Sequence, residues 1–255
     1  MLASEPPRLW EDRNVEFMAR SSRIPDIRHQ LAESPLFSGV GEAALARIID
    51  LGHVRRTSVG ECFFTEGGPA DEFFLLTGGR VKLTQVTAEG NQVVLRFIGP
   101  GDVFGGAGAF GDPTYPTTAE AVEPSTAFTW TSNAMRTVFE TEPAVTLNAV
   151  HVIAAQLYDL QRRYRQLMTE RVDRRVARAL LRLVREAGRR VDNGVEVDFA
   201  ISRQDIAEMT GTTLYTVSRL LSAWEERGIL SGGRQHIVLV NADALVTIAQ
   251  DPPDS

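Results

Sequence analysis

The stretch GTTLYTVSR, residues 211–219, gathers hydroxyl groups, a phenol ring and one guanidinium within nine residues. An arginine can donate two hydrogen bonds to O6 and N7 of guanine, and Ser and Thr hydroxyls can donate to DNA phosphates. At 100° per residue, Tyr215, Ser218, Arg219 and Ser222 fall on one side of a helix, and the apolar residues of the segment fall on the other. This pattern predicts a helix that packs on a core and presents DNA-contacting side chains to solvent.

Capping and turn residues around this helix predict a helix-turn-helix. Ser202 with Asp205 three residues later forms a capping box, Gly211 breaks the chain, and Thr213 can cap the second helix. After Gly228, the run ILSGGRQHIVLV predicts a two-stranded wing. The predicted DNA-contacting residues are Ser202, Arg203, Thr213, Leu214, Tyr215, Thr216, Ser218, Arg219 and Ser222. The alternative is an exposed helix that carries Ser, Thr and Arg without a ligand.

Upstream, apolar residues repeat at heptad spacing. Intervals of three and four residues alternate along the predicted helix, and this gives a seam narrower than an ordinary core-facing stripe. We therefore favour a parallel dimer of this helix over a helix packed only on its own domain. The predicted dimer interface consists of Val150, Ile153, Leu157, Leu160 and Tyr164.

The remaining chain divides into regions of different pattern. From Pro35 to about Trp130, short β-rich runs alternate with glycines at intervals of roughly ten residues, which predicts a small antiparallel barrel or roll. An arginine-rich helix then ends near Gly188, and Asn193-Gly194 predicts a hairpin. The predicted fold is α+β, with an N-terminal arm (1–34), a jelly-roll-like β-roll (35–132), a dimerisation helix (133–170) and a winged helix-turn-helix (171–250).

Composition excludes several classes of protein. The 255 residues are 43% hydrophobic and 24% charged, no apolar run is long enough to span a bilayer, and the N-terminus lacks the apolar core of a secretory signal. These features predict a cytoplasmic protein without a membrane partner. The net charge is −6, but residues 171–250 hold twelve arginines against ten acidic residues. The single cysteine, Cys62, excludes an intrachain disulfide and a metal site built from several thiolates of one chain.

The segment ISRQDIAEMTGTTLYTVSRLLSAWEERGIL resembles the DNA-binding signature of the Crp–Fnr bacterial transcription regulators. The upstream order of GECFFTEGGPADEFFLLTGGRVKLT and EGNQVVLRFIGPGDVFGG resembles their cyclic-nucleotide-binding-type β-roll, so that the resemblance covers about residues 36–245. It implies a homodimer on a near-palindromic operator in double-stranded DNA, and contact with RNA polymerase if the protein is an activator. It also implies an effector, bound in or beside the roll, that repositions the recognition helices through the dimer helix.

The sequence departs from the members of this family that bind cyclic AMP. Those members carry Gly-Glu within a Phe-x-Gly-Glu stretch and an Arg-Ser or Arg-Thr pair further on. Here the two stretches read FGGA (104–107) and YPTTA (115–119), without a carboxylate or a guanidinium. A buried phosphate without its arginine loses a charge-assisted pair and is desolvated, so the sequence predicts no cyclic AMP binding. We place the effector pocket at Phe104, Gly105, Gly106, Ala107, Thr117, Thr118 and Leu157.

The same comparison of residues bears on which other cofactors the protein can bind. The N-terminal cysteine set of Fnr is missing, which argues against an iron–sulfur cluster. A small organic effector and haem remain as alternatives, with His151, His53 or Cys62 as the axial ligand of haem. A thiol switch at Cys62 is a third, although a small buried hydrophobe is the simpler interpretation of this residue.

Two further functional alternatives are a roll that regulates a protein partner and a metal-dependent enzyme built on the roll. The enzyme would need two histidines and a carboxylate, and only His53 lies in the roll region. We predict no enzyme activity. Tyr215 replaces the Glu of most Crp–Fnr relatives, so the preferred half-site is expected to differ.

Overall fold

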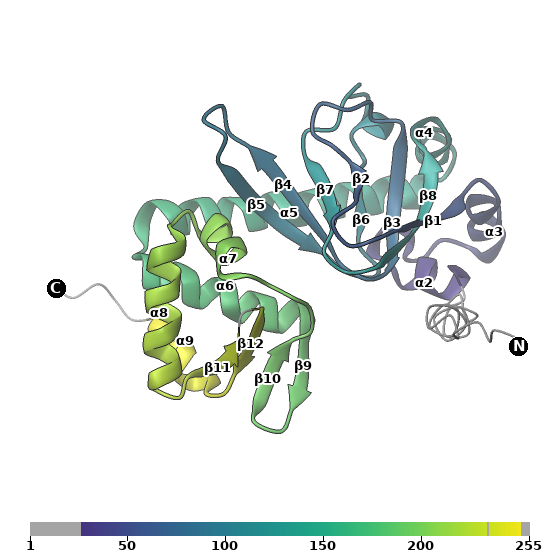
Figure 1. The fold of residues 1–255 in the computed structure, drawn as a ribbon. Helices are drawn as coiled ribbons and strands as arrows, with labels where there is room; N and C mark the ends of the chain where they lie inside the picture. The colour runs from purple at the N-terminus through teal and green to yellow at the C-terminus, as the bar shows by residue number, and fades with distance from the viewer. Residues whose placement is uncertain (1–26, 234, 251–255) are drawn as a thin grey trace, which may run out of the picture.

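The computed structural model describes residues 27–233 and 235–250. A β-roll and a helical C-terminal domain are joined by one long helix that runs along both (Figure 1). Most of the predicted N-terminal arm lies outside the described residues. Its last part forms helix α2 (Ile27–Glu33), whose Leu31 is fully buried in the roll core. This short helix therefore belongs to the roll.

The roll is a pair of antiparallel sheets, as predicted. The strand orders are β1-β8-β3-β6 and β2-β7-β4-β5. The strands are β1 (His53–Thr57), β2 (Cys62–Phe64), β3 (Glu72–Gly78), β4 (Val81–Val86), β5 (Gln92–Ile98), β6 (Val103–Phe104), β7 (Thr118–Ala121) and β8 (Ser125–Thr131). Gly79 makes the tight turn from β3 to β4 at φ 83°, where a Cβ would lie 2.5 Å from the Pro124 carbonyl oxygen.

Helices close the ends of the roll and lead away from it. They are η1 (Pro35–Phe37), α3 (Glu42–Asp50), η2 (Gly108–Phe110), α4 (Ser132–Thr141) and α5 (Pro143–Thr169). The region predicted as one dimerisation helix, 133–170, is therefore two helices. Pro143 explains the break, because it has no N–H to continue α4 and is well suited to the first turn of α5.

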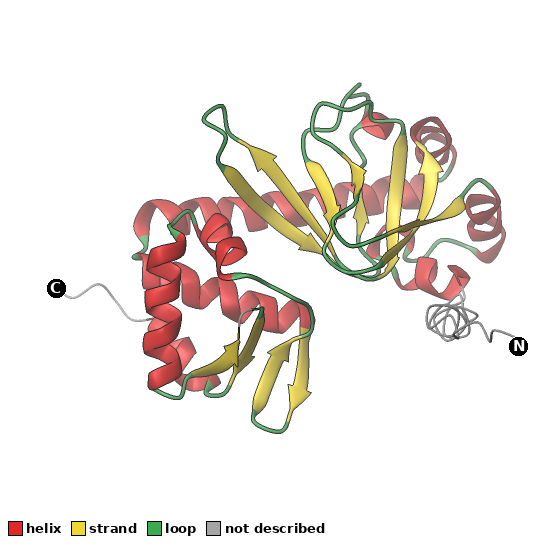
Figure 2. Cartoon of the chain, in the orientation of Figure 1, coloured by secondary structure: helices red, strands yellow, loops and turns green. Residues whose placement is uncertain are grey.

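The C-terminal domain surrounds a second core. It consists of α6 (Val172–Ala187), β9 (Gly188–Val191), β10 (Gly194–Val197), α7 (Arg203–Thr210), α8 (Leu214–Glu226), β11 (Leu230–Gly233), β12 (His236–Leu239) and α9 (Ala242–Gln250). The predicted wing and the predicted hairpin are both present, but they form one sheet in the order β11-β12-β10-β9, because β10 pairs with β12 (Figure 2). The wing is therefore part of a four-stranded sheet and not an isolated hairpin.

The two domains share a packed contact. Val94 and Phe97 of β5 belong to the same buried cluster as the C-terminal core, and the Phe97 and Phe199 ring centroids lie 4.8 Å apart. Strand β5 of the roll therefore packs directly on the core of the C-terminal domain. Within the described ranges, no helix has the length and apolar character needed to cross a membrane.

Candidate nucleic-acid interface

Three local features define the helix-turn-helix: a capping box, a left-handed glycine and a threonine cap. The Ser202 hydroxyl accepts from the Asp205 N–H at 3.0 Å, and the Asp205 carboxylate accepts from the Ser202 N–H at 2.9 Å, which completes the capping box at the start of α7. Gly211 ends α7 in the left-handed region at φ 60°. The Thr213 hydroxyl accepts from the Thr216 N–H at 3.2 Å and starts α8. The predicted capping and turn residues are confirmed.

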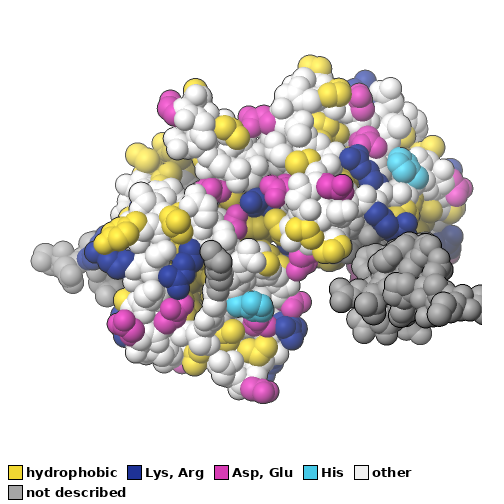
Figure 3. All heavy atoms as spheres, in the orientation of Figure 1, with side chains coloured by type: hydrophobic (Ala, Val, Ile, Leu, Met, Phe, Trp, Pro, Cys, Tyr) yellow, Lys and Arg dark blue, Asp and Glu magenta, His cyan; other side chains and the backbone are white. Residues whose placement is uncertain are grey.

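Helix α8 has one buried and one exposed face. Val217, Leu221 and Trp224 are buried, whereas the Tyr215 side of the helix faces solvent and Tyr215 itself is 77% exposed. Arg219 is also exposed and forms no hydrogen bond or ion pair within the described residues. Lys and Arg side chains lie over α8 on the face that Figure 3 shows. The helix therefore presents an unpaired guanidinium to solvent.

Two of the residues predicted to contact DNA form hydrogen bonds within the domain. The Ser202 hydroxyl is occupied in the capping box. The Arg203 guanidinium donates to the Glu225 carboxylate at 3.1 Å and to the Ser218 carbonyl at 3.3 Å, so it ties α7 to α8. Direct DNA contact by these two residues stays a prediction. Of the other predicted residues, Thr213, Leu214, Tyr215 and Arg219 are exposed, and Thr216, Ser218 and Ser222 are partly exposed.

Arg175 is a structural residue of the interface that the sequence did not reveal. Its guanidinium donates to the Thr210 carbonyl at 3.0 Å and to the Glu170 carbonyl at 2.8 Å. Burial lowers the pKa of Arg175, against the opposing influence of Glu170. The residue connects the end of α5 to the turn between α7 and α8. An arginine in an arginine-rich helix is usually expected on a solvated face, so the sequence did not indicate these contacts.

A buried ion pair connects the helix-turn-helix to the roll. Lys82 Nζ on β4 lies 3.0 Å from Asp205 Oδ1, and the two side chains are only 12% and 15% exposed. Burial disfavours the charged form of Asp205, but hydrogen bonds from Ser202 and the charge of Lys82 outweigh it and lower the pKa. The capping box of α7 is therefore also an attachment point for the roll.

The depressed pKa of Asp205 predicts an acid-dependent loss of stability. Because the folded-state pKa lies below the unfolded value, the carboxylate stabilises the protein above that unfolded value, and the stabilisation is lost as pH falls through the folded pKa. Asp205→Asn should lower Tm at neutral pH, and its gap from wild type should close as pH falls below the ordinary Asp pKa of about 4. Asp243→Asn, an exposed change in α9, is the control. A Tm gap that stays constant with pH contradicts this role.

A cavity of about 360 Å³ lies between the roll and α5. Five of the seven predicted pocket residues line it: Phe104, Gly105, Gly106, Ala107 and Thr117. The predictions for Thr118 and Leu157 are corrected, because neither lines this cavity among the described residues. The Thr118 hydroxyl instead accepts from the Glu66 N–H at 3.0 Å, and α5 contributes Ile153 and Gln156.

The cavity is mostly apolar with a few polar groups. Its aromatic walls include Phe64, Phe73 and Phe139. Arg96 of β5 also lines it, although the sequence showed no guanidinium in the two stretches where relatives place theirs, and it pairs with Asp102 at 3.3 Å. Such a pocket suits a small organic molecule with an apolar body.

The candidate haem ligands lie elsewhere. His53 is exposed on β1, and His151 is exposed on α5 beside a different cavity that Ser34 and Asn148 also line. Neither histidine is among the described residues of the apolar pocket, so this pocket offers haem no histidine.

Cys62 is partly buried, and burial followed by the charge of Glu120 raises the pKa of its thiol. A raised pKa reduces the thiolate on which a redox switch depends. The described residues contain no group of three His, Cys, Asp or Glu side chains able to hold a metal ion.

Comparison with known proteins agrees with this geometry. Residues 54–142 match the cyclic nucleotide-binding domain, and residues 174–248 match the Crp-like helix-turn-helix domain. The CRP-like cAMP-activated global transcriptional regulator of Mycobacterium tuberculosis is 24% identical over 86% of this chain and 98% of its own length. The Cyclic AMP receptor protein of Thermus thermophilus is 27% identical over 85% of this chain and 97% of its own length.

A solved structure shows the same architecture. FixK2 from Bradyrhizobium japonicum is 26% identical, and its structure matches with a TM-score of 0.68. The aligned region covers 80% of this chain and 99% of FixK2. Together the two matches include the helix-turn-helix and the pocket residues from Phe64 to Phe139, but not those of α5. The chain belongs to the Crp–Fnr family of transcription regulators. It is a regulator of the DNA-binding type.

Proposed function

We propose that this protein is a homodimer that recognises a near-palindromic site in double-stranded DNA, and that an effector in the roll controls this binding. The observation that carries the proposal is the exposed face of α8, where Arg219 has no partner within the described residues. The N–H groups at the start of α8 add a site for a DNA phosphate, because a helix N-terminus favours anions. Position and chemistry together match a recognition helix in the major groove.

The exposed face of α5 supports the dimer. Val150, Ile153, Leu157, Leu160 and Tyr164 are 57%, 49%, 51%, 53% and 63% exposed, at heptad spacing on one helix. Contiguous apolar surface of this kind marks an interaction site, and heptad spacing selects a second helix of the same pattern as the occupant. A second copy of the chain supplies that helix. A two-fold axis along α5 would then present two copies of α8 to the same duplex.

Two contacts suggest how the effector would reach the DNA-binding helices. Ile153 lines the apolar cavity and also belongs to the heptad seam, so a ligand there touches the dimer contact directly. Lys82 on β4 holds Asp205 at the start of α7. An effector that moves the seam or the β4–β5 hairpin would therefore shift the helix-turn-helix. Contact with RNA polymerase stays a prediction.

The test of DNA recognition is selection of preferred sites from random duplex DNA by the full chain. Enrichment of an inverted repeat would support a dimeric, sequence-specific regulator. Unpatterned enrichment would reject it.

We expect no cyclic AMP binding at micromolar concentration. Ala107 and Thr117 line the cavity where relatives that bind cyclic AMP place their carboxylate and guanidinium, and Arg96 is already paired with Asp102. The cyclic phosphate would therefore be desolvated without a free charge partner. Titration calorimetry of the full chain measures this, and a micromolar Kd would contradict the assignment of an uncharged or largely apolar effector.

A further inference from the structure

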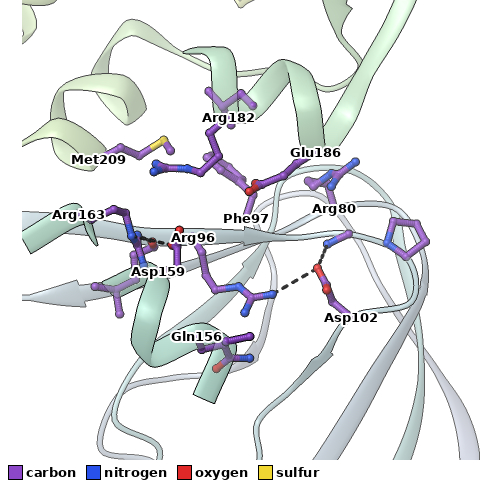
Figure 4. A pocket seen from close by; sticks show the side chains of 15 residues that line it. Arg80, Arg96, Phe97, Asp102, Gln156, Asp159, Arg163, Arg182, Glu186 and Met209 are labelled. Atoms are coloured by element: carbon purple, nitrogen blue, oxygen red, sulfur yellow. Dashed lines mark hydrogen bonds and ion pairs between the residues drawn. The ribbon is translucent and has the colours of Figure 1, made fainter. Parts of the chain in front are cut away.

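A second cavity, of about 510 Å³, lies where the roll, α5 and the C-terminal domain meet (Figure 4). Of the described residues, four arginines line it. Arg80 and Arg96 come from the roll, Arg163 comes from α5, and Arg182 comes from α6. The cavity is thus a place where both domains and the connecting helix contribute positive charge.

Two of these arginines are neutralised by carboxylates of the cavity itself. Arg96 lies 3.3 Å from the Asp102 carboxylate, and Arg163 Nε lies 2.9 Å from the Asp159 carboxylate. Arg163 also donates to the Leu95 carbonyl. Their charges are therefore accounted for without a ligand.

Arg182 lacks a direct carboxylate partner of this kind. It forms no hydrogen bond or ion pair within the described residues, and in Figure 4 it reaches from α6 toward Arg163 on α5. The remaining carboxylate of the cavity, Glu186, pairs at 3.7 Å with Arg185, which does not line it. Burial lowers the pKa of Arg182 and the positive charge of Arg163 lowers it further, against the opposing influence of Glu186 and Asp159. A desolvated cation next to a like charge is costly unless an anion joins it.

Arg80 adds a second, incompletely satisfied cation. Its Nε is buried without a hydrogen-bond acceptor, and its guanidinium lies 4.8 Å from the centre of the Phe199 ring. Burial lowers the pKa of Arg80 against the opposing influence of Glu123 and other carboxylates. The described lining of the cavity therefore holds four arginines against three carboxylates, an excess of one positive charge.

The chemistry of the missing ligand follows from these groups. Arginine forks match phosphate oxygens in bidentate geometry, and the N–H groups of Arg182 and Arg80 that lack acceptors suit an anion with several oxygens. Leu95, Phe97, Leu183 and Met209 form an apolar wall beside the arginines, where the organic part of a ligand can pack.

We propose that this inter-domain cavity binds a small molecule that carries a phosphate group. The phosphate oxygens contact Arg182 from the C-terminal domain, with Arg163 and Arg80 completing the positive surface. Because the ligand joins α6 to α5 and the roll, its binding holds the C-terminal domain in one orientation. This site is distinct from the apolar pocket of the roll, although Arg96 and Gln156 line both.

The test uses the full chain without DNA and inorganic pyrophosphate as the probe, at constant ionic strength. Titration calorimetry should show binding to wild type, and Arg182→Gln should weaken it about tenfold or more, because a charge-assisted hydrogen bond is lost. Arg190→Gln removes an exposed cation of β9 that does not line the cavity, and it should bind as wild type does.

Thermal unfolding separates ligand binding from folding. In phosphate-free buffer Arg182→Gln should unfold at or above the wild-type Tm, because it removes an unpaired cation. Pyrophosphate should then raise the Tm of wild type and of Arg190→Gln, but not that of Arg182→Gln. Absence of pyrophosphate binding, or equal binding by wild type and Arg182→Gln, would overturn the proposal. Duplex binding is assayed separately, so either result leaves the proposed DNA recognition independently testable.

Discussion

Replacing Arg219 by Ala is expected to weaken binding to the preferred duplex by about 1–3 kcal/mol, or roughly 5- to 150-fold. Arg219 is exposed on α8 and has no partner within the described residues, so its loss leaves the fold intact and removes a base contact. Specificity at the base pair that it reads should relax at the same time. Fluorescence anisotropy with the selected duplex, at one fixed salt concentration, measures both effects.

Two further variants separate base recognition from simple loss of charge. Arg219→Lys keeps the cation but loses the planar fork, so it should retain binding to random duplex while losing preference for the selected site. Arg190→Ala removes an exposed arginine of β9 and should change affinity little. An Arg219→Ala protein with wild-type affinity, or one that weakens equally on every sequence, would contradict the assigned role.

Replacing Leu157 by Glu is expected to dissociate the proposed dimer. Leu157 is 51% exposed at the middle of the heptad seam, where a two-fold axis would place it against its own copy. An uncompensated buried charge costs about 3–5 kcal/mol, and each dimer would bury two. Sedimentation velocity should therefore show monomer at concentrations where wild type is dimeric, and operator binding should fall sharply.

The matched control is Tyr158→Glu. Tyr158 is the next residue of α5 and is 69% exposed, but it lies outside the heptad seam. The control should stay dimeric, and circular dichroism should show that both variants remain folded. If Leu157→Glu sediments as a tight dimer, α5 is not the dimer interface.

Local rules predicted much of the helix-turn-helix. The capping box of Ser202 and Asp205, the left-handed Gly211 and the Thr213 cap each depend on residues within four positions in the chain. The two faces of α8 follow from helical periodicity alone. These features could be predicted because their partners are neighbours in sequence.

Contacts between distant segments could not be predicted in this way. Lys82 and Asp205 are separated by 123 residues, and the join between β10 and β12 decides the sheet of the C-terminal domain. Arg203 was predicted to contact DNA, but Glu225 lies within reach of its guanidinium once α7 packs on α8. The cavity around Arg182 likewise exists only because three separate parts of the chain meet there.

Which residues of α5 line the pocket of the roll also depends on contacts between distant segments. The glycine-rich segment Phe104–Ala107 lines the cavity, whereas Leu157, the residue expected from α5, does not. Ile153 and Gln156 face the cavity, whereas Leu157 does not line it, and a rotation of one residue on a helix decides between them. Sequence spacing defines the seam of α5 but not how that seam is rotated against the roll.

The most direct test of the central claim is the selection of binding sites from random duplex DNA by the full-length protein. A dimer that places two copies of α8 in successive major grooves should enrich an inverted repeat whose half-sites are centred about one helical turn, or 10–10.5 base pairs, apart. Each half-site should contain a guanine whose enrichment disappears when the selection is repeated with Arg219→Ala. Enrichment of a single, unrepeated motif, or of no motif at all, would contradict recognition of DNA by a two-fold symmetric pair of α8 helices.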